Sequence, residues 1–352
     1  EQNTRLKKTV ITSTGFETPL KDEVKNVYVI TSEEIKDRGY TSVSEVLERA
    51  PGVYIRNAGE FGLEEIDIRG QGPYAKTNVR TLINGMDLNV LKAGHGNIAT
   101  PFNLIAVEDI ERIEIVPGGG SVLYGGGTTG GVINIITKKG ALEPHGKIDL
   151  AAGSYQHRVY RFNYSGSTKD GSFRYFVSGM RDRGGSTNYY DRMTAQEYKA
   201  NNTGFNDSSF NIRLDKYFGK DKKLTFSFNH TDAYDGYPIT VPDYRYMTKA
   251  EYLAMMHRYK VLKLYGAIKN QGYRNNWYSN GFRGTATGHN NFDYDLTYSF
   301  GKDHDMESYV RAYYQMHKYW LVWGPREASV WGAALCRRLG IPSGTSISKP
   351  GQ

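Results

Sequence analysis

The sequence predicts a small α+β domain, with a mixed sheet and short helices, followed by antiparallel strands of an incomplete transmembrane β-barrel. Two observations lead to this prediction. The first 140 residues contain short apolar strands separated by turns and by a glycine-rich segment. From residue 146 onward, apolar and polar residues alternate over long runs, which is typical of strands with one face in lipid and the other in water.

The glycine-rich segment joins two predicted strands near the end of the first domain. Ile110–Val116 alternates apolar and charged residues, so its two faces differ. Gly131–Thr137 is almost continuously apolar, which predicts burial on both faces. The glycines between these strands allow backbone angles that other residues avoid. No G-K-S/T or G-x-G-x-x-G signature occurs here, and a strand follows the glycines, which argues against a phosphate site.

Upstream patterns predict a helix and a hairpin. Residues 41–49 place apolar side chains at helical spacing, with Thr41 or Ser42 as the cap. Val79–Leu88 has two extended arms around Asn84-Gly85, a two-residue turn signal. Four apolar segments of this domain are expected to form one small mixed sheet: Val27–Ile30, Leu82–Ile83, Ile113–Ile115 and Val132–Ile136.

The second half contains about seven alternating runs. Within Phe292–Tyr298, aromatic and aliphatic residues alternate with Asp293, Asp295 and Thr297. The polar faces are too polar for a packed core and the others too apolar for water, so lipid outside and a wet lumen fit both. A soluble, tyrosine-rich β protein is the alternative. The strands are expected at 147–153, 158–167, 172–183, 206–218, 223–234, 289–300 and 306–319.

Short and long connections alternate between these runs after the first hairpin. Thr168–Gly171 and Gly219–Lys223 are short, whereas 184–204 and 235–288 are long, as periplasmic turns and extracellular loops are in barrels. A sheet of seven strands has two open edges, and lipid offers no hydrogen-bond partners for the backbone groups there. We therefore expect an N-terminal fragment that does not itself transport. The tail, 321–352, is irregular, which a frame change and a shortened loop explain equally well.

Composition excludes several classes of function. The chain has 352 residues, a net charge of +8 and one cysteine, Cys336. One cysteine forms no internal disulfide and no multi-cysteine metal site. The positive charges are scattered, without the cluster and stacking aromatics of a nucleic-acid surface. No catalytic motif is found, so we expect no enzyme activity and no cofactor.

Five ordered motifs over residues 9–140 resemble the plug domain of TonB-dependent outer-membrane receptors. In that family the sequence of the glycine-rich stretch is roughly I-E-R-I-E-V, a short R-G-P turn, S-x-L-Y-G, and then G-G-V-I-N-I-I-T-K. Ile110–Ile115, Ser121–Gly125 and Gly130–Lys138 match almost letter for letter, whereas Val116–Gly118 departs from the usual Arg-Gly-Pro. The other matching segments are 28–35, 50–53, 66–70 and 79–88.

The resemblance implies a division of the chain and a function. Residues 1–18 would hold the TonB box and an extension, 19–140 the plug, 146–320 the first barrel strands and 321–352 the tail. The protein would be a receptor in the outer membrane of a Gram-negative bacterium. It would take up a scarce ligand with energy from TonB and its inner-membrane complex.

A ferric siderophore is the leading ligand that the resemblance implies. Haem is the alternative, and cobalamin and oligosaccharide stay possible. A non-transporting outer-membrane binding or adhesin-like protein is the alternative of another class. The expected partners are the C-terminal domain of TonB, the ligand and outer-membrane lipid, and no nucleic acid.

Lys8–Thr12 resembles the TonB box of this family. The resemblance implies that Thr9, Val10, Ile11 and Thr12 pair as an added strand with the C-terminal domain of TonB. Such β-augmentation draws affinity from backbone hydrogen bonds and selectivity from alternate side chains. An ordinary first strand of the plug sheet is the other interpretation.

The resemblance also implies residues that hold the plug in the barrel. Arg69 and Arg112 would pair with barrel glutamates. The other interpretation is that both are solvated surface arginines.

The plug's outward loops are expected to bind substrate. Tyr74 could stack on a catecholate or macrocycle, and Lys76 would favour an anionic ferric chelate. His95 would ligate haem iron in the haem alternative, or else is an ordinary polar loop residue, and no other metal ligand is predicted. The substrate-binding residues are expected to be Gln71, Tyr74, Lys76, His95 and Asn97.

Overall fold

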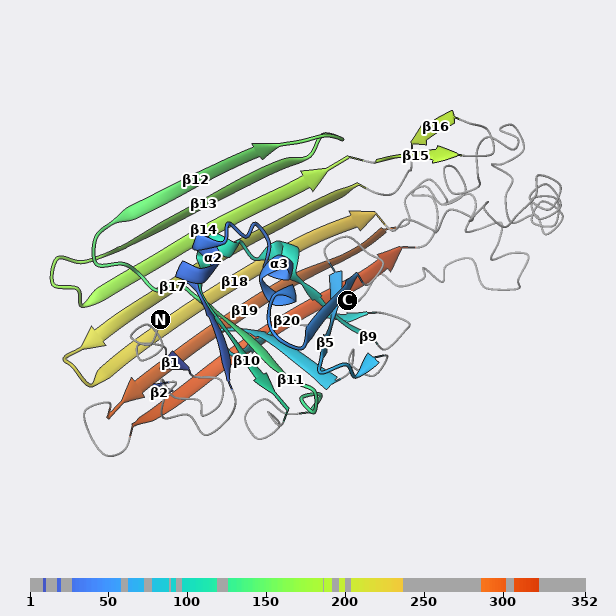
Figure 1. Cartoon of the computed structure of the whole chain (residues 1–352). Coiled ribbons are helices and arrows are strands. Elements are labelled where there is room, and N and C mark those ends of the chain that lie inside the picture. Colours follow the sequence, from blue (N-terminus) through green and yellow to red (C-terminus); the bar gives the residue numbers. More distant parts are fainter. Residues whose placement is uncertain are drawn as a thin grey trace, which may run out of the picture.

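The computed structural model of the protein has two parts, an N-terminal domain (residues 27–140) and a wall of long strands (residues 145–322), which lie against each other (Figure 1). No helix in the described part of the chain is long and apolar enough to cross a membrane. The structure describes residues 9–10, 18–19, 27–57, 63–72, 78–88, 90–92, 97–118, 126–185, 187–191, 196–199, 204–236, 286–301 and 307–322.

A mixed sheet forms the centre of the N-terminal domain, as the four apolar segments predict. Its strand order is β3 (Tyr28–Thr31), β10 (Ile110–Pro117), β11 (Gly131–Thr137), β6 (Val79–Ile83) and β7 (Met86–Asp87). β10 is antiparallel to both of its neighbours, whereas β11 and β6 run parallel. Every residue of β11 is buried, as predicted. On β10 the charged face is buried as well, because Arg112 and Glu114 form an ion pair there.

The hairpin predicted at 79–88 is present. β6 and β7 pair antiparallel, and Leu82 lies opposite Asp87. Asn84 and Gly85 make the turn with φ values of 50° and 77°. These left-handed angles are the ones that a two-residue Asn-Gly turn requires.

Two short helices, α2 (Ser32–Asp37) and α3 (Val43–Glu48), follow β3. Each begins with a capping box, in which Thr31 or Ser42 accepts a hydrogen bond from the third residue of the helix. Of the two caps considered for the second helix, Ser42 is the one that the structure shows.

A second sheet and two 3₁₀ helices complete the N-terminal domain. The sheet has the order β4 (Val53–Asn57), β5 (Leu63–Ile68), β9 (Asn97–Pro101) and β8 (Val90–Lys92). The 3₁₀ helices are η3 (Phe102–Leu104) and η4 (Val107–Asp109). One apolar core joins this sheet, the helices and the mixed sheet, and Phe102, Leu47 and Ile133 are among its most buried members.

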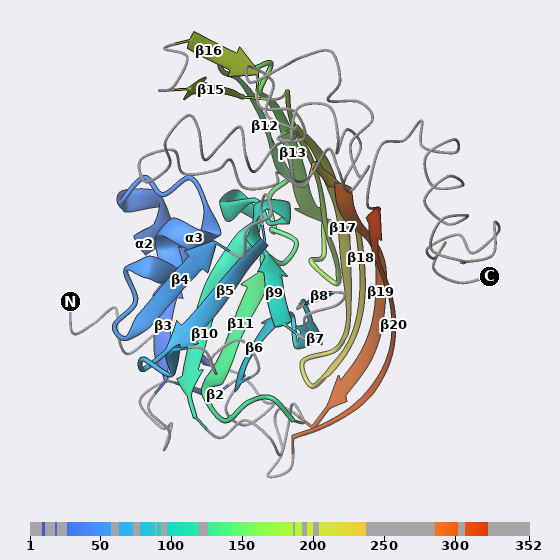
Figure 2. The ribbon, with the colours of Figure 1, turned by 90° about the vertical axis from the view of Figure 1, so that its right-hand side faces the viewer.

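The wall is a seven-stranded antiparallel sheet, and all seven strands lie where alternation predicts them. A separate pair, β15 (Asn188–Asp191) and β16 (Gln196–Lys199), lies between β14 and β17 in the sequence. Figure 2 shows that the wall is curved and turns its concave side toward the N-terminal domain. The strand order is β12 (His145–Ala152), β13 (Arg158–Ser167), β14 (Phe173–Gly184), β17 (Phe205–Phe218), β18 (Lys222–Gly236), β19 (Ala286–Phe300) and β20 (Ser308–Val322).

The two faces of the wall differ as the alternation predicts. Polar residues on the concave face, such as Asp207 and Asn229, are buried. The other face exposes aromatic and aliphatic side chains, as a lipid-facing surface would. The exposed set includes Ile148, Leu150, Tyr160, Phe162, Tyr164, Tyr294, Leu296, Tyr298 and Tyr314.

Gly131 opens β11 at a place where no side chain fits. Its φ is 148°, and a Cβ atom there would lie 2.7 Å from the Val116 carbonyl oxygen and 2.9 Å from Ile68 Cδ1. Gly131→Ala should therefore destabilise the N-terminal domain by about 1–3 kcal/mol, as overpacked core substitutions do. Urea unfolding measures this loss. Gly126→Ala is the matched control, because no atom lies within 4 Å of its Cβ position.

Candidate functional site

The N-terminal domain contacts the concave face of the wall through its η3–η4 segment. The amide of Asn103 donates a hydrogen bond to the Asp207 carboxylate of β17. In the opposite sense, Asn163 Nδ2 of β13 donates to Asp109 Oδ1 at 3.2 Å. Leu104 and Ala106 pack with Met180 and Ala233 of the wall in a small apolar cluster. Hydrogen bonds in both directions thus lie on either side of this apolar cluster.

Asp109 is a buried acid in this contact. Burial raises the pKa of its carboxyl, and hydrogen bonds from Ser178 and Asn163 of the wall act against that rise by favouring the charged form. Burial is the larger of these effects, so the pKa of Asp109 stays above its ordinary value.

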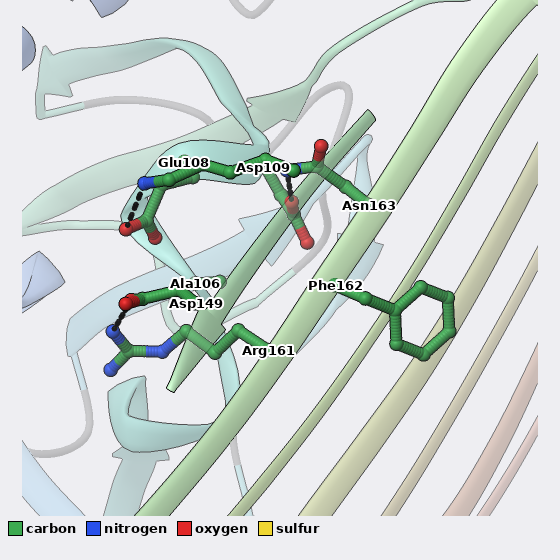
Figure 3. A pocket seen from close by; sticks show the side chains of 8 residues that line it. Ala106, Glu108, Asp109, Asp149, Arg161, Phe162 and Asn163 are labelled. Carbon is green, nitrogen blue, oxygen red and sulfur yellow. Dashed lines mark hydrogen bonds and ion pairs between the residues drawn. The ribbon is translucent and has the colours of Figure 1, made fainter. Parts of the chain in front are cut away.

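A small polar pocket lies beside Asp109, between η4 and the first two wall strands (Figure 3). It has a volume of about 210 Å³. Lys147 Nζ lies 3.3 Å from Glu108 Oε1, and Arg161 Nη1 lies 3.3 Å from Asp149 Oδ2. Each of these four charges has an opposite charge within the pocket, so we interpret the pocket as part of the interface.

A second contact joins the β6–β7 turn to the far end of the wall. Arg311 Nη2 of β20 donates to the Asn84 carbonyl oxygen at 3.1 Å. Three residues further along the chain, at Asp87 of β7, Gln315 Nε2 donates to the carbonyl oxygen at 3.1 Å, and Gln315 Oε1 accepts from the amide at 3.4 Å. The domain is therefore held at two separate places on the concave face, one at β13, β14 and β17 and the other at β20.

Arg112 lies in a buried charge cluster on β10. Its guanidinium lies 2.7 Å from Glu114 Oε1 and 2.7 Å from Glu111 Oε1. Only 7% of its side chain is exposed, so the interpretation as a solvated surface arginine is wrong for this residue. Glu111 also interacts electrostatically with Arg213 of β17. Within the described residues, Arg112 thus reaches the wall through Glu111, and a barrel glutamate as its partner stays a prediction.

Arg69 lies on the surface at the end of β5. Its φ is 64°, and its backbone N–H donates to the Gly52 carbonyl oxygen at 2.8 Å. The structure does not bring it together with Arg112, and its pairing with a barrel glutamate stays a prediction as well.

Of the five residues expected to bind substrate, the structure describes two, Gln71 and Asn97. Tyr74, Lys76 and His95 lie outside the described residues. Gln71 is described, and its side chain serves the domain itself, because Nε2 donates to the Ile68 carbonyl oxygen at 3.2 Å and Oε1 accepts from Asn78 at 3.1 Å. In β9, Asn97 pairs with Lys92 of β8. Substrate binding by these residues stays a prediction.

Part of the predicted TonB-binding segment is described. Thr9 and Val10 form β1, which pairs antiparallel with β2 (Thr18–Pro19). Ile11 and Thr12 lie outside the described residues. The described pair is therefore extended, which is the backbone conformation that strand addition needs.

Sequence patterns missed the residues that make the interface. Asn103, Asp109, Arg311 and Gln315 belong to no motif, and Arg311 is separated from its partner Asn84 by 227 positions. The only local signal was the alternation in the wall, which predicted a strand at 306–319 without identifying the residues that meet the plug.

A folded domain that fills the concave side of a curved antiparallel wall, with polar bonds at two distant places, has the architecture of a plugged outer-membrane barrel. Residues 19–132 match the family described as TonB-dependent Receptor Plug Domain. The chain is also 30% identical over 177 residues to a vitamin B12 transporter of Vibrio vulnificus, covering 50% of this chain and 28% of that protein. It is 30% identical over 148 residues to a ferric enterobactin receptor of Pseudomonas aeruginosa, covering 39% and 19%.

Two solved structures share the fold. The ferripyoverdine receptor of the Pseudomonas aeruginosa outer membrane matches with a TM-score of 0.60 and 17% identity, over 90% of this chain and 37% of that one. The siderophore receptor PirA of Acinetobacter baumannii matches with a TM-score of 0.57 and 23% identity, over 83% and 40%.

Residues 19–132 therefore form a plug domain of the kind found in TonB-dependent receptors, and antiparallel strands follow it. The plug match and the curated relatives place the chain in the outer membrane of a Gram-negative bacterium. The chain spans about a third or less of the length of the first curated relatives, namely 28% and 36%.

Proposed function

We propose that the chain carries the plug and the first barrel strands of a receptor that takes up a ferric siderophore by TonB-dependent transport. The observation that supports this most is the double attachment of the plug to the wall, at Asn103–Asp207 and at Arg311–Asn84. A plug held by hydrogen bonds at two distant places closes the lumen at rest. Passage of a bulky ligand then needs work on the plug, which TonB would supply through residues 9–12.

The interface residues have separate tasks in this proposal. Asn103 and Asp109 hold the side of the plug that faces β13, β14 and β17. Arg112 compensates the buried charge of Glu114 on β10 and also pairs with Glu111. Arg69 and Arg112 are proposed to complete the attachment to the barrel. Gln71, Tyr74, Lys76, His95 and Asn97 are proposed to meet the ligand.

Vitamin B12 is the second candidate ligand, because two relatives that match over half of this chain or more are named vitamin B12 transporters. The siderophore is preferred because relatives named as ferric enterobactin and siderophore receptors match in sequence and in fold. Haem rests on His95 alone.

Titration of the receptor with ferric enterobactin, haemin and cyanocobalamin tests the ligand class. If a ferric catecholate is carried, Tyr74→Ala and Lys76→Ala should each weaken its binding about tenfold, by loss of stacking or of a fixed positive charge. His95→Ala is the matched control and should change little. If His95→Ala instead weakens haemin binding and alters the haem absorption spectrum, the haem alternative is right. Tight binding of cyanocobalamin alone would favour the second candidate, and binding without uptake would favour a non-transporting protein.

A further inference from the structure

The β6–β7 turn is part of the rigid centre of the plug. Asn84 N donates to the Ile135 carbonyl oxygen at 2.9 Å, and Asn84 Oδ1 accepts from the Thr137 amide at 3.0 Å. Gly85 N donates to Asn134 Oδ1 at 3.0 Å. All three partners belong to β11, whose residues are completely buried. Force applied to this turn therefore reaches the middle of the plug sheet directly.

On its other side the turn is gripped by two side chains of the wall. Arg311 and Gln315 lie four residues apart on β20, so their side chains point to the same face. Arg311 bonds the Asn84 carbonyl oxygen, and Gln315 bonds both the carbonyl oxygen and the amide of Asp87. The groups of the hairpin that Arg311 and Gln315 bond are all backbone groups. The specificity of this contact therefore resides in Arg311 and Gln315.

Carboxylates of the neighbouring strand orient both side chains. Asp295 of β19 forms an ion pair with Arg311. Asp293 accepts a hydrogen bond from Gln315 Nε2 at 2.9 Å, and its other oxygen accepts from Asn229 at 3.0 Å. Held in this way, the two gripping side chains lose less rotamer freedom when they bind the turn.

Gly85 leaves space for the close approach of Arg311. A Cβ atom there would lie 2.9 Å from Arg311 Nη1, and the φ of 77° disfavours any residue with a side chain. The turn signal Asn84-Gly85 thus serves two purposes, because it closes the hairpin and admits the guanidinium.

Free space lies on another side of the same turn. A small cavity, with space for about one water molecule, separates it from β17 and β18. Asn84, Met86 and Thr137 line it from the plug, and Asn211, Arg213 and Asn229 line it from the wall. The turn is therefore held by directed bonds on one side and borders a small cavity on another.

We propose that Arg311 and Gln315 are positioning residues that clamp the β6–β7 turn to the wall, and that this clamp opens when ligand passes between plug and wall. The second half of this inference rests on the proposed transport function. The first half concerns only how the plug is held.

Amide hydrogen exchange in the detergent-solubilised receptor tests how the plug is held. Gln315→Glu keeps the shape of the side chain but replaces the Nε2 donor by an oxygen, which faces the Asp87 carbonyl oxygen and the Asp293 carboxylate. Combined with Arg311→Lys, it should speed amide exchange in 79–88 at least tenfold. Exchange in 28–31, at the far edge of the same sheet, should stay unchanged. Arg181→Lys is the matched control, because Arg181 bonds Asn206 within the wall and does not touch the plug.

A permeation assay tests the opening. In cells, the double variant should admit vancomycin, a probe otherwise too large to pass, without TonB, and the Arg181→Lys control should not. Unchanged exchange in 79–88 would overturn the clamp, even if ligand uptake proves TonB-dependent. Faster exchange together with vancomycin permeation, in a receptor that takes up no ligand, would keep the clamp and refute the proposed function. Faster exchange without vancomycin permeation would refute the opening at this place.

Discussion

Replacing Val10 by proline is expected to reduce ligand uptake to the level of cells that lack TonB, while ligand binding at the outer face survives. Proline removes the Val10 backbone donor and fixes φ, and both changes disrupt the addition of a strand to another sheet. Transport of radiolabelled ligand into cells, measured beside binding to the same cells, checks both halves of this expectation.

The structure supplies a matched control for this experiment. Val10 pairs with Thr18 in the short β1–β2 ladder, so Val10→Pro also breaks a contact inside the chain. Thr18→Pro breaks the same ladder and leaves Lys8–Thr12 intact, so uptake should persist in it. Equal loss of uptake in both variants would assign the effect to the β1–β2 ladder. Normal uptake in Val10→Pro would remove the TonB-box assignment altogether.

Alternation located the wall strands because each has one face toward the plug and one toward the outside. The run predicted at 158–167 coincides with β13. The run predicted at 206–218 begins one residue later than β17 and ends at the same residue. The prediction ended the last run at 319, whereas β20 continues to Val322. The period of two survives to the strand ends because neighbouring strands pair along their whole length.

The same pattern was insufficient for β10. Alternation of Ile113 and Ile115 with Arg112 and Glu114 indicates two different faces, and it does not say whether the charged face meets water. In the structure that face is buried, and Glu114 is 0% exposed. Burial here depends on long-range packing and on the pairing of opposite charges. A single segment carries no signal for either.

The interface residues could not be predicted from the sequence for a related reason. Asn103, Arg311 and Gln315 look like ordinary polar residues in their local sequence. Their roles arise when strands far apart in the chain are brought together, as with Gln315 and Asp87, which are 228 positions apart. Motif matching found the plug because its glycines and apolar strands are contiguous. It could not find where the plug would be held.

Breaking the buried pair on β10 is expected to have the largest effect on the stability of the plug. Arg112→Met would leave the Glu114 carboxylate buried without its guanidinium, which should lower the free energy of unfolding by about 3–5 kcal/mol. Arg56→Met is the matched control. Arg56 lies 3.6 Å from Glu65 and is 47% exposed, so its loss should cost less than about 1 kcal/mol.

The double variant Arg112→Met with Glu114→Leu separates charge from packing. If the cost of Arg112→Met is that of a buried charge, removing the second charge should restore most of the lost stability, because apolar residues of similar volume replace buried ion pairs at little cost. Exchange of the buried β11 amides under native conditions measures the free energy of unfolding for each variant. A double variant as unstable as Arg112→Met would show that side-chain shape, or the lost bond to Glu111, decides the stability of this face. An Arg112→Met variant as stable as Arg56→Met would show that the charge cluster contributes nothing, and would remove Arg112 from the residues proposed to hold the plug.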